Sequence, residues 1–148
     1  MAAAIEIGGV TVQATQGATL TTTTGDIVNS TIEGSTVALT AGNNISNTAV
    51  EALTTADLTA TAGILDASVV AGTTATLGAA LIADSSVFAG TDATLTAAQI
   101  AGTAVTALND AALTGAVLSA NAISAGNDAT LTGTVQVVGN TVDAAATA

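Results

Sequence analysis

Three aspartates, Asp92, Asp110 and Asp128, follow one another at intervals of eighteen residues. If eighteen residues form one coil of a regular fold, these carboxylates stack with like charge, which is unfavourable unless water, protons or a cation relieves it. Carboxylate oxygens are hard ligands that suit Ca²⁺. The aspartates are therefore interpreted either as solvated turn residues or as a Ca²⁺ site, with no other cofactor expected. Glu33 and Glu51 should stack in the same way.

Three segments carry the pattern Thr-x-Thr, which places both hydroxyls on one face of a strand. They are Thr19 and Thr21, Thr94 and Thr96, and Thr130 and Thr132. A flat threonine array resembles the face of ice-binding solenoid proteins, so one interpretation is an ice-binding or ligand-binding face. The other is that Thr suits a half-exposed strand, and both Asp57 and Gly78 interrupt the array.

The composition removes most other chemistry. The 148 residues include no Lys, Arg, His or Cys, and the formal net charge is −11. Without a cationic side chain the protein cannot grip phosphates, so no nucleic-acid partner is expected. Thiol and imidazole catalysis are excluded, and no carboxylate stands apart from the repeat, so the chain is not expected to be an enzyme. No apolar run approaches the ~20 residues of a spanning helix, so membrane insertion is not expected.

A repeat supplies the elements that position these residues. From Gly72 the chain can be written in lines of eighteen, and each line carries a triple of large aliphatics such as Leu77, Ile82 and Val87. Steps within the later triples are five and five, and the step to the next coil is eight; earlier coils run eighteen or nineteen residues. A short fixed period indicates a solenoid, because one unit cannot bury its apolar side alone.

Three inward aliphatics per coil predict three short strands per coil. The predicted fold is an all-β, single-domain parallel β-solenoid over 1–148, with about seven to eight coils of 18–19 residues. Regular coils are expected at about 16–143, with irregular ends at 1–15 and 144–148. Residues at the corners need positive φ. The column Asn29, Asn47, Asp66 and Asp84 lies at such a corner, where stacked amides would form a ladder or line a ligand groove.

The line LTAGNNISNTAVEA (39–52) resembles the haemagglutinin repeats of large bacterial filamentous adhesins, which follow an L-T-A-x-x-x-I-x-N-x-x-V-x-A pattern. ATLGAALIADSSVFAG (75–90) is a degenerate version, and the resemblance spans about residues 16–143. It implies a right-handed parallel β-solenoid and an adhesin-like role. The left-handed hexapeptide solenoid also has eighteen residues per coil, but it prefers a spacing of six.

Both ends of the chain are apolar and strand-like, and the sequence has no Pro or Lys with which to blunt a strand edge. The residues expected to form assembly surfaces are Ile5, Ile7, Val10, Val12, Val135, Val137, Val138 and Val142. Apolar ends with unpaired strand edges predict head-to-tail stacking into filaments. The expected function is a self-assembling structural subunit of an extracellular or cell-surface fibre, sheath or biofilm-matrix filament. The alternatives are an adhesin fragment or an ice-binding solenoid.

Overall fold

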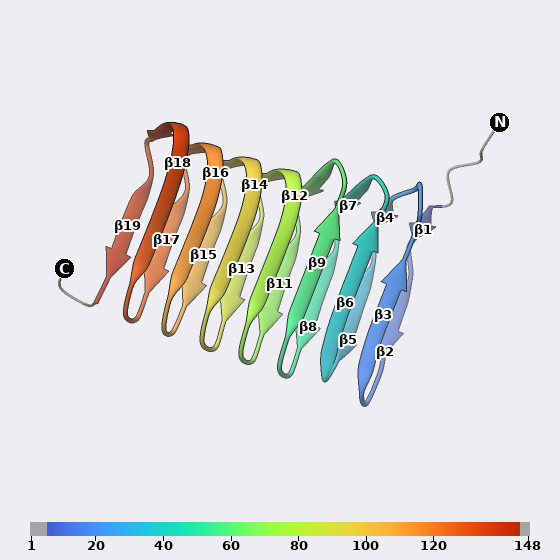
Figure 1. The fold of residues 1–148 in the computed structure, drawn as a ribbon. Coiled ribbons are helices and arrows are strands. Elements are labelled where there is room, and N and C mark those ends of the chain that lie inside the picture. Colours follow the sequence, from blue (N-terminus) through green and yellow to red (C-terminus); the bar gives the residue numbers. More distant parts are fainter. Residues whose placement is uncertain (1–5, 146–148) are drawn as a thin grey trace.

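A computed structural model describes residues 6–145 as a rod of stacked coils, with β1 (Ile7–Gly8) at one end and β19 (Thr141–Ala144) at the other (Figure 1). Every described strand pair is parallel, and the strands form one sheet of eleven and one of eight. Residues 6–145 contain no helix. The predicted all-β parallel solenoid of about eight coils is therefore confirmed.

The strands fall into three rows, named here after the aliphatic residue that each row buries. In the first coils the Leu row consists of β3 (Gly17–Thr21), β6 (Thr36–Ala41) and β9 (Ala56–Ala60), and the Ile row of β1, β4 (Ile27–Val28), β7 (Asn44–Ser46) and β10 (Gly63–Leu65). From Ala75 one long strand per coil spans both rows: β12 (Ala75–Ala83), β14 (Ala93–Ala101), β16 (Ala111–Ser119) and β18 (Ala129–Val138). The Val row forms the second sheet: β2 (Thr11–Gln13), β5 (Thr31–Gly34), β8 (Ala49–Ala52), β11 (Ser68–Ala71), β13 (Ser86–Ala89), β15 (Ala104–Ala107), β17 (Ala122–Ala125) and β19.

Three strands per coil are therefore present only in the N-terminal part of the rod. The step from the buried Leu to the buried Ile is seven residues from Leu20 and six from Leu39 and Leu58, which leaves room for a turn between strands. From Leu77 the step shortens to five, and the turn is replaced by continuous strand. The two strands merge because five residues span only one extended segment.

The core is a thin column of stacked aliphatic side chains. Leu39 pairs in register with Leu58, and the Leu row continues through Leu77 with each side chain 1% exposed. Alternate residues on each strand point outward, as the pleat requires. Each fully buried aliphatic side chain stabilises the fold by about 1.5–3 kcal/mol, so the repeating rows supply most of the cohesion along the rod.

The N-terminal segment joins this register earlier than the sequence indicates. Ile7 pairs with Ile27 and Val12 with Ile32, so the regular ladder begins at Ile7 and not at about residue 16. Both spacings are twenty residues, because the first coil carries two extra residues in its corners, and this hid the pattern. At the N-terminal end the Ile and Val rows therefore begin one coil before the Leu row, whose first strand is β3, so this end of the rod is not flat.

The last coil contains a β-bulge. Gly133 pairs with Gly115 and Gln136 with Val117, so two residues of β18 stand opposite the single residue Ala116. The inserted residue moves Val137, and not Gln136, into the Ile row opposite Leu118. A bulge absorbs one extra residue without breaking the ladder on either side.

Candidate functional site: the corners, the threonine face and the two ends

The aspartates predicted as a column lie at the corner before the long strand in three successive coils. Asp92 Oδ1 accepts hydrogen bonds from the Asp110 backbone N–H at 3.2 Å and from Asn109 Nδ2 at 2.9 Å. Asp110 Oδ1 accepts from the Asp128 N–H at 3.1 Å and from Asn127 Nδ2 at 3.0 Å. The Asp92 and Asp110 carboxylates therefore each tie their coil to the next one, which is a structural role.

The asparagine partners were not anticipated from the sequence, although the repeated dipeptide Asn-Asp at 109–110 and 127–128 was the available signal. Within residues 6–145 there is no group of three or more His, Cys, Asp or Glu side chains that could hold a metal ion. Binding of Ca²⁺ to Asp92, Asp110 and Asp128 stays a prediction.

A second corner, between the Ile and Val rows, has positive φ in every described coil. The angles are 49° at Asn29, 52° at Asn47, 50° at Asp66 and Asp84, 61° at Gly102, 53° at Ala120 and 62–64° at Gly139 and Gly9. Asn and Gly tolerate this conformation, whereas Ala does not adopt it readily. Asn47 Nδ2 donates to Asn29 Oδ1 at 3.2 Å, which is one rung of the predicted amide ladder.

The residue after each of these corner positions is in most coils a buried Ser, Thr or Asn, and sequence reasoning did not single it out. The buried members are Ser30, Thr48, Ser85, Thr103 and Asn121. Asn121 Oδ1 accepts from the Thr103 N–H at 3.0 Å, and its Nδ2 donates to the Ile100 carbonyl at 3.0 Å. No buried side-chain nitrogen or oxygen among the described residues lacks a partner. These side chains satisfy backbone groups that the corner would otherwise leave buried and unpaired.

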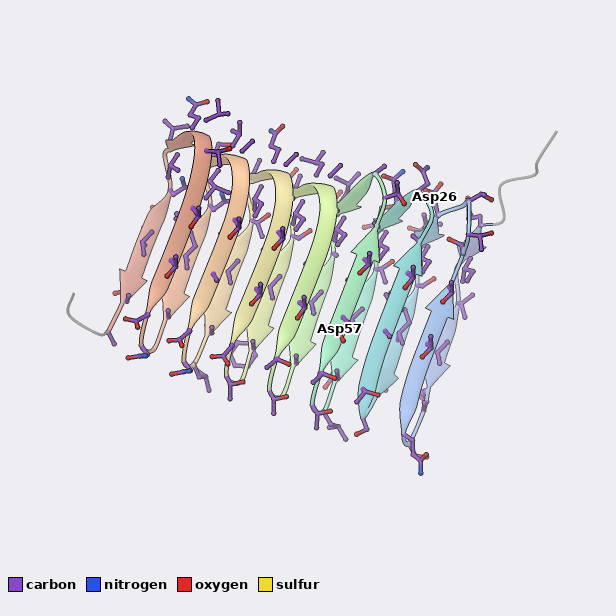
Figure 2. The ribbon with its side chains drawn as sticks, viewed as in Figure 1. Asp26 and Asp57 are labelled. Atoms are coloured by element: carbon purple, nitrogen blue, oxygen red, sulfur yellow. The ribbon has the colours of Figure 1, made fainter. Side chains whose placement is uncertain are left out.

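The predicted threonine face exists as exposed columns on the outer side of the Leu row (Figure 2). All six residues of the three Thr-x-Thr pairs are exposed. Thr19 lies in the same in-register column as Ala38 and Asp57, and Thr94 and Thr130 continue it. Figure 2 labels Asp57 on this face, where it interrupts the hydroxyl array.

Glu33 and Glu51 pair directly, as expected, on the outer side of the Val row. Glu33 also accepts a hydrogen bond from Gln13 Nε2 at 3.0 Å. The column continues into Val70 and Phe88, which are 42% and 39% exposed. The side of the rod therefore changes along its length from carboxylates to a small apolar patch.

The C-terminal end leaves its core rows open. Val137 and Val142 follow Leu118 and Ile123 in the Ile and Val rows. Leu118 is 0% and Ile123 3% exposed, whereas Val137 is 50% and Val142 47% exposed, because no described coil covers them. The other two predicted assembly residues lie beside these rows: Val138, whose strand position points outward, and Val135 at the bulge. This end thus presents an apolar surface that matches the interior of the rod.

The N-terminal end is covered to a greater extent. Ile7, Val10 and Val12 are half-buried, and Ile7 and Val12 pack against the core. The Val10 carbonyl accepts from the Thr31 N–H at 2.8 Å, so Val10 is tied to the next coil. Ile5 lies outside the described residues. Among the described strands, none pairs with the outer edges of β1, β2 and β3, or of β18 and β19.

Comparison of the chain with protein-family models found no match, and neither curated protein sequences nor solved structures gave one. The resemblance to haemagglutinin repeats therefore stays a prediction. Over residues 6–145 no helix is both long and apolar enough to cross a membrane.

Proposed function

We propose that this protein is a structural subunit that stacks end to end into an extracellular or cell-surface filament. The observation that carries the proposal is the exposure of Val137 and Val142, because these side chains continue buried rows yet remain half in water. Covering them with another coil recovers the hydrophobic free energy that every interior coil already gains. The open strand edges at both ends would gain hydrogen-bonded partners in the same step.

The composition suits this role. Carboxylates along the sides, without a single basic side chain to offset them, keep rods apart sideways, while the C-terminal end exposes the core-row residues Val137 and Val142. The chain also offers no Lys or Arg to trypsin-like proteases, which suits a durable material outside the cell.

Electron microscopy of the purified protein, with and without Ca²⁺, tests the proposal. Uniform filaments of the rod's width are expected, and a variant with Val137→Asp and Val142→Asp should remain as short rods because it places carboxylates in the open core rows. Val70→Asp is the matched control, since it adds a carboxylate on the side of the rod. Protein that stays monomeric at high concentration under all of these conditions rejects the proposal.

The exposed Thr columns favour a second candidate, an ice-binding face on the Leu row. Thr94, Thr96, Thr130 and Thr132 lie on one side of two strands that are separated by a single coil, at a regular spacing. Thermal hysteresis in the wild-type protein that is lost on Thr94→Leu and Thr96→Leu would support it. No hysteresis in the wild-type monomer rejects it, whatever the ends do.

A further inference from the structure

The C-terminal end carries all three rows, whereas at the N-terminal end only the Ile and Val rows reach the outermost coil and the Leu row begins one coil later, at β3. The Ile and Val rows of the two ends can therefore be compared strand by strand. At the C-terminal end the open strands are β18, which includes the Ile row, and β19 of the Val row. At the N-terminal end the outermost strands are β1 of the Ile row and β2 of the Val row. Resting β1 and β2 of one copy on β18 and β19 of another continues both rows by one coil.

Resting on the proposed end-to-end function, we propose that this junction is in register and is held by two glutamine–carboxylate pairs, Gln136 with Glu6 and Asp143 with Gln13 of the next copy. The columns fix which residues meet. Ile7 belongs to the column of Ile27 and Val137 to that of Leu118, so Val137 meets Ile7. In the same way Val142 meets Val12.

The hydrogen-bonding edges are complementary at this register. At the start of the Val-row strand, the N–H donates toward the preceding coil at every level described: Thr31 to Val10, Ala122 to Thr103 and Thr141 to Asn121, at 2.8–3.0 Å. Thr11 occupies this position at the N-terminal end. Its N–H therefore faces the coil that a preceding copy would supply, where the Asn140 carbonyl is the equivalent acceptor. Gly139 and Gly9, at φ of 62° and 64°, give the two copies the same corner shape.

The polar side chains at the junction are matched in charge. Asp143 is one column position beyond Val142, and Gln13 one beyond Val12, so the two meet. Gln13 already donates one amide hydrogen to Glu33 at 3.0 Å. Because an amide has two hydrogens, the second is available for Asp143, and Gln13 then separates two carboxylates that would repel each other.

In the second pair the roles of the two ends are exchanged: the C-terminal end supplies the glutamine, Gln136, and the N-terminal end supplies the carboxylate, Glu6. Glu6 directly precedes Ile7, as Asp26 precedes Ile27, and this column continues through Leu81 and Gln99 to Gln136. The same column already contains an amide–carboxylate hydrogen bond within the chain, because Asp26 Oδ1 accepts from Asn44 Nδ2 at 3.1 Å. Two of the four glutamines of the sequence therefore lie where a carboxylate of the other copy arrives, and no like-charge pair forms.

Charge substitutions test the pairs. The variant Gln136→Glu creates a carboxylate pair with Glu6 at each junction, and its critical concentration for assembly should rise about twofold or more. This rise in the critical concentration should largely disappear at about 1 M NaCl, where the Debye length falls to ~3 Å and charges further apart are screened from each other. Gln99→Glu is the control, since it adds the same charge in the same column away from the ends. Gln136→Glu combined with Glu6→Gln restores one matched pair and should assemble like the wild type.

Cysteine cross-linking tests the register, because the natural chain has no Cys. Thr11 and Thr141 are exposed and occupy one column, so in the junction their Cα atoms are ~4.8 Å apart, within the range of a disulfide. Thr11→Cys with Thr141→Cys should give a ladder of covalent multimers on oxidation, whereas Thr11→Cys with Val142→Cys, whose side chains point to opposite faces, should not. If the charge variants assemble like the wild type and the in-register cysteines do not cross-link, this junction is overturned, but end-to-end assembly is not. Absence of filaments in the wild type overturns both.

Discussion

At the scale of the residue, one corner carries measurable backbone strain. Ala120 has φ of 53°, a conformation that Gly adopts freely and that a Cβ disfavours by about 1–2 kcal/mol. Ala120→Gly should therefore raise the free energy of unfolding by about 0.5–1 kcal/mol, once the larger chain entropy of Gly is deducted. Urea denaturation followed by circular dichroism measures the change. Ala122→Gly, at an exposed strand position two residues on, should lower the midpoint instead.

Asn121 should be among the most sensitive polar positions. Its side chain accepts from the Thr103 N–H and donates to the Ile100 carbonyl, and the residue is 1% exposed. Asn121→Ala removes the acceptor of the buried Thr103 N–H and a donor to the Ile100 carbonyl, so a loss of about 1–3 kcal/mol is expected in the same urea assay. Asn127→Ala removes an exposed hydrogen bond to Asp110 and should cost no more than about 0.5 kcal/mol. Equal effects of the two substitutions would contradict the role assigned to the buried column.

The sequence indicated the positive-φ corners because Asn, Asp and Gly recur there, but it did not reveal the contacts that these corners support. The Asn109 and Asn127 hydrogen bonds depend on which neighbour each side chain reaches across a coil. The buried Ser, Thr and Asn column was hidden for a related reason. A small polar residue beside a turn looks like a solvated one until burial is known.

At the scale of the element, the close approach of successive coils explains several of the glycines at the corners, such as Gly72, Gly90 and Gly126. A Cβ at Gly90 would lie 2.0 Å from the Gly72 carbonyl oxygen, whereas a Cβ at Gly78 would meet nothing within 4 Å. Neither residue has positive φ, so the space available decides the outcome. Gly90→Ala should lower the thermal midpoint markedly by forcing two coils apart, and Gly78→Ala should leave it unchanged or raise it slightly. A neutral Gly90→Ala would mean that the corner can widen freely.

The rows themselves could be predicted from the aliphatic triples, because a residue that must be buried in every coil leaves a periodic signal. The junctions between rows could not, because one residue more or less at a corner decides between a turn, continuous strand and a bulge. The steps of five after Leu77 were visible, yet their consequence, a single strand across two rows, depends on backbone geometry. At Gly133–Gln136 the same ambiguity placed Val137 in the core row, whereas a strict eighteen-residue period counted from Leu118 leads to Gln136.

At the scale of the whole molecule, the rod separates its two kinds of surface. The sides carry a net charge that no basic residue offsets, while Val137 and Val142 at the C-terminal end are half-exposed core residues. In the proposed assembly, sideways contact between filaments would bring carboxylates of equal sign together along their full length. The proposed end-to-end junction would bring Gln13, Gln136, Glu6 and Asp143 together only once per subunit.

Ionic strength should therefore act differently on length and on width. At about 10 mM salt the Debye length is ~30 Å, and single unbundled filaments are expected; at about 1 M it is ~3 Å, and lateral bundles should form because the side charges no longer repel. Electron microscopy reports the width and light scattering the onset of bundling. CaCl₂ and MgCl₂ at equal ionic strength separate screening from binding. If Ca²⁺ causes bundling, Mg²⁺ does not, and Asp110→Asn abolishes the effect, the aspartate column contains a specific Ca²⁺ site. If both cations act equally, the column serves only as the carboxylate–amide ladder that joins successive coils.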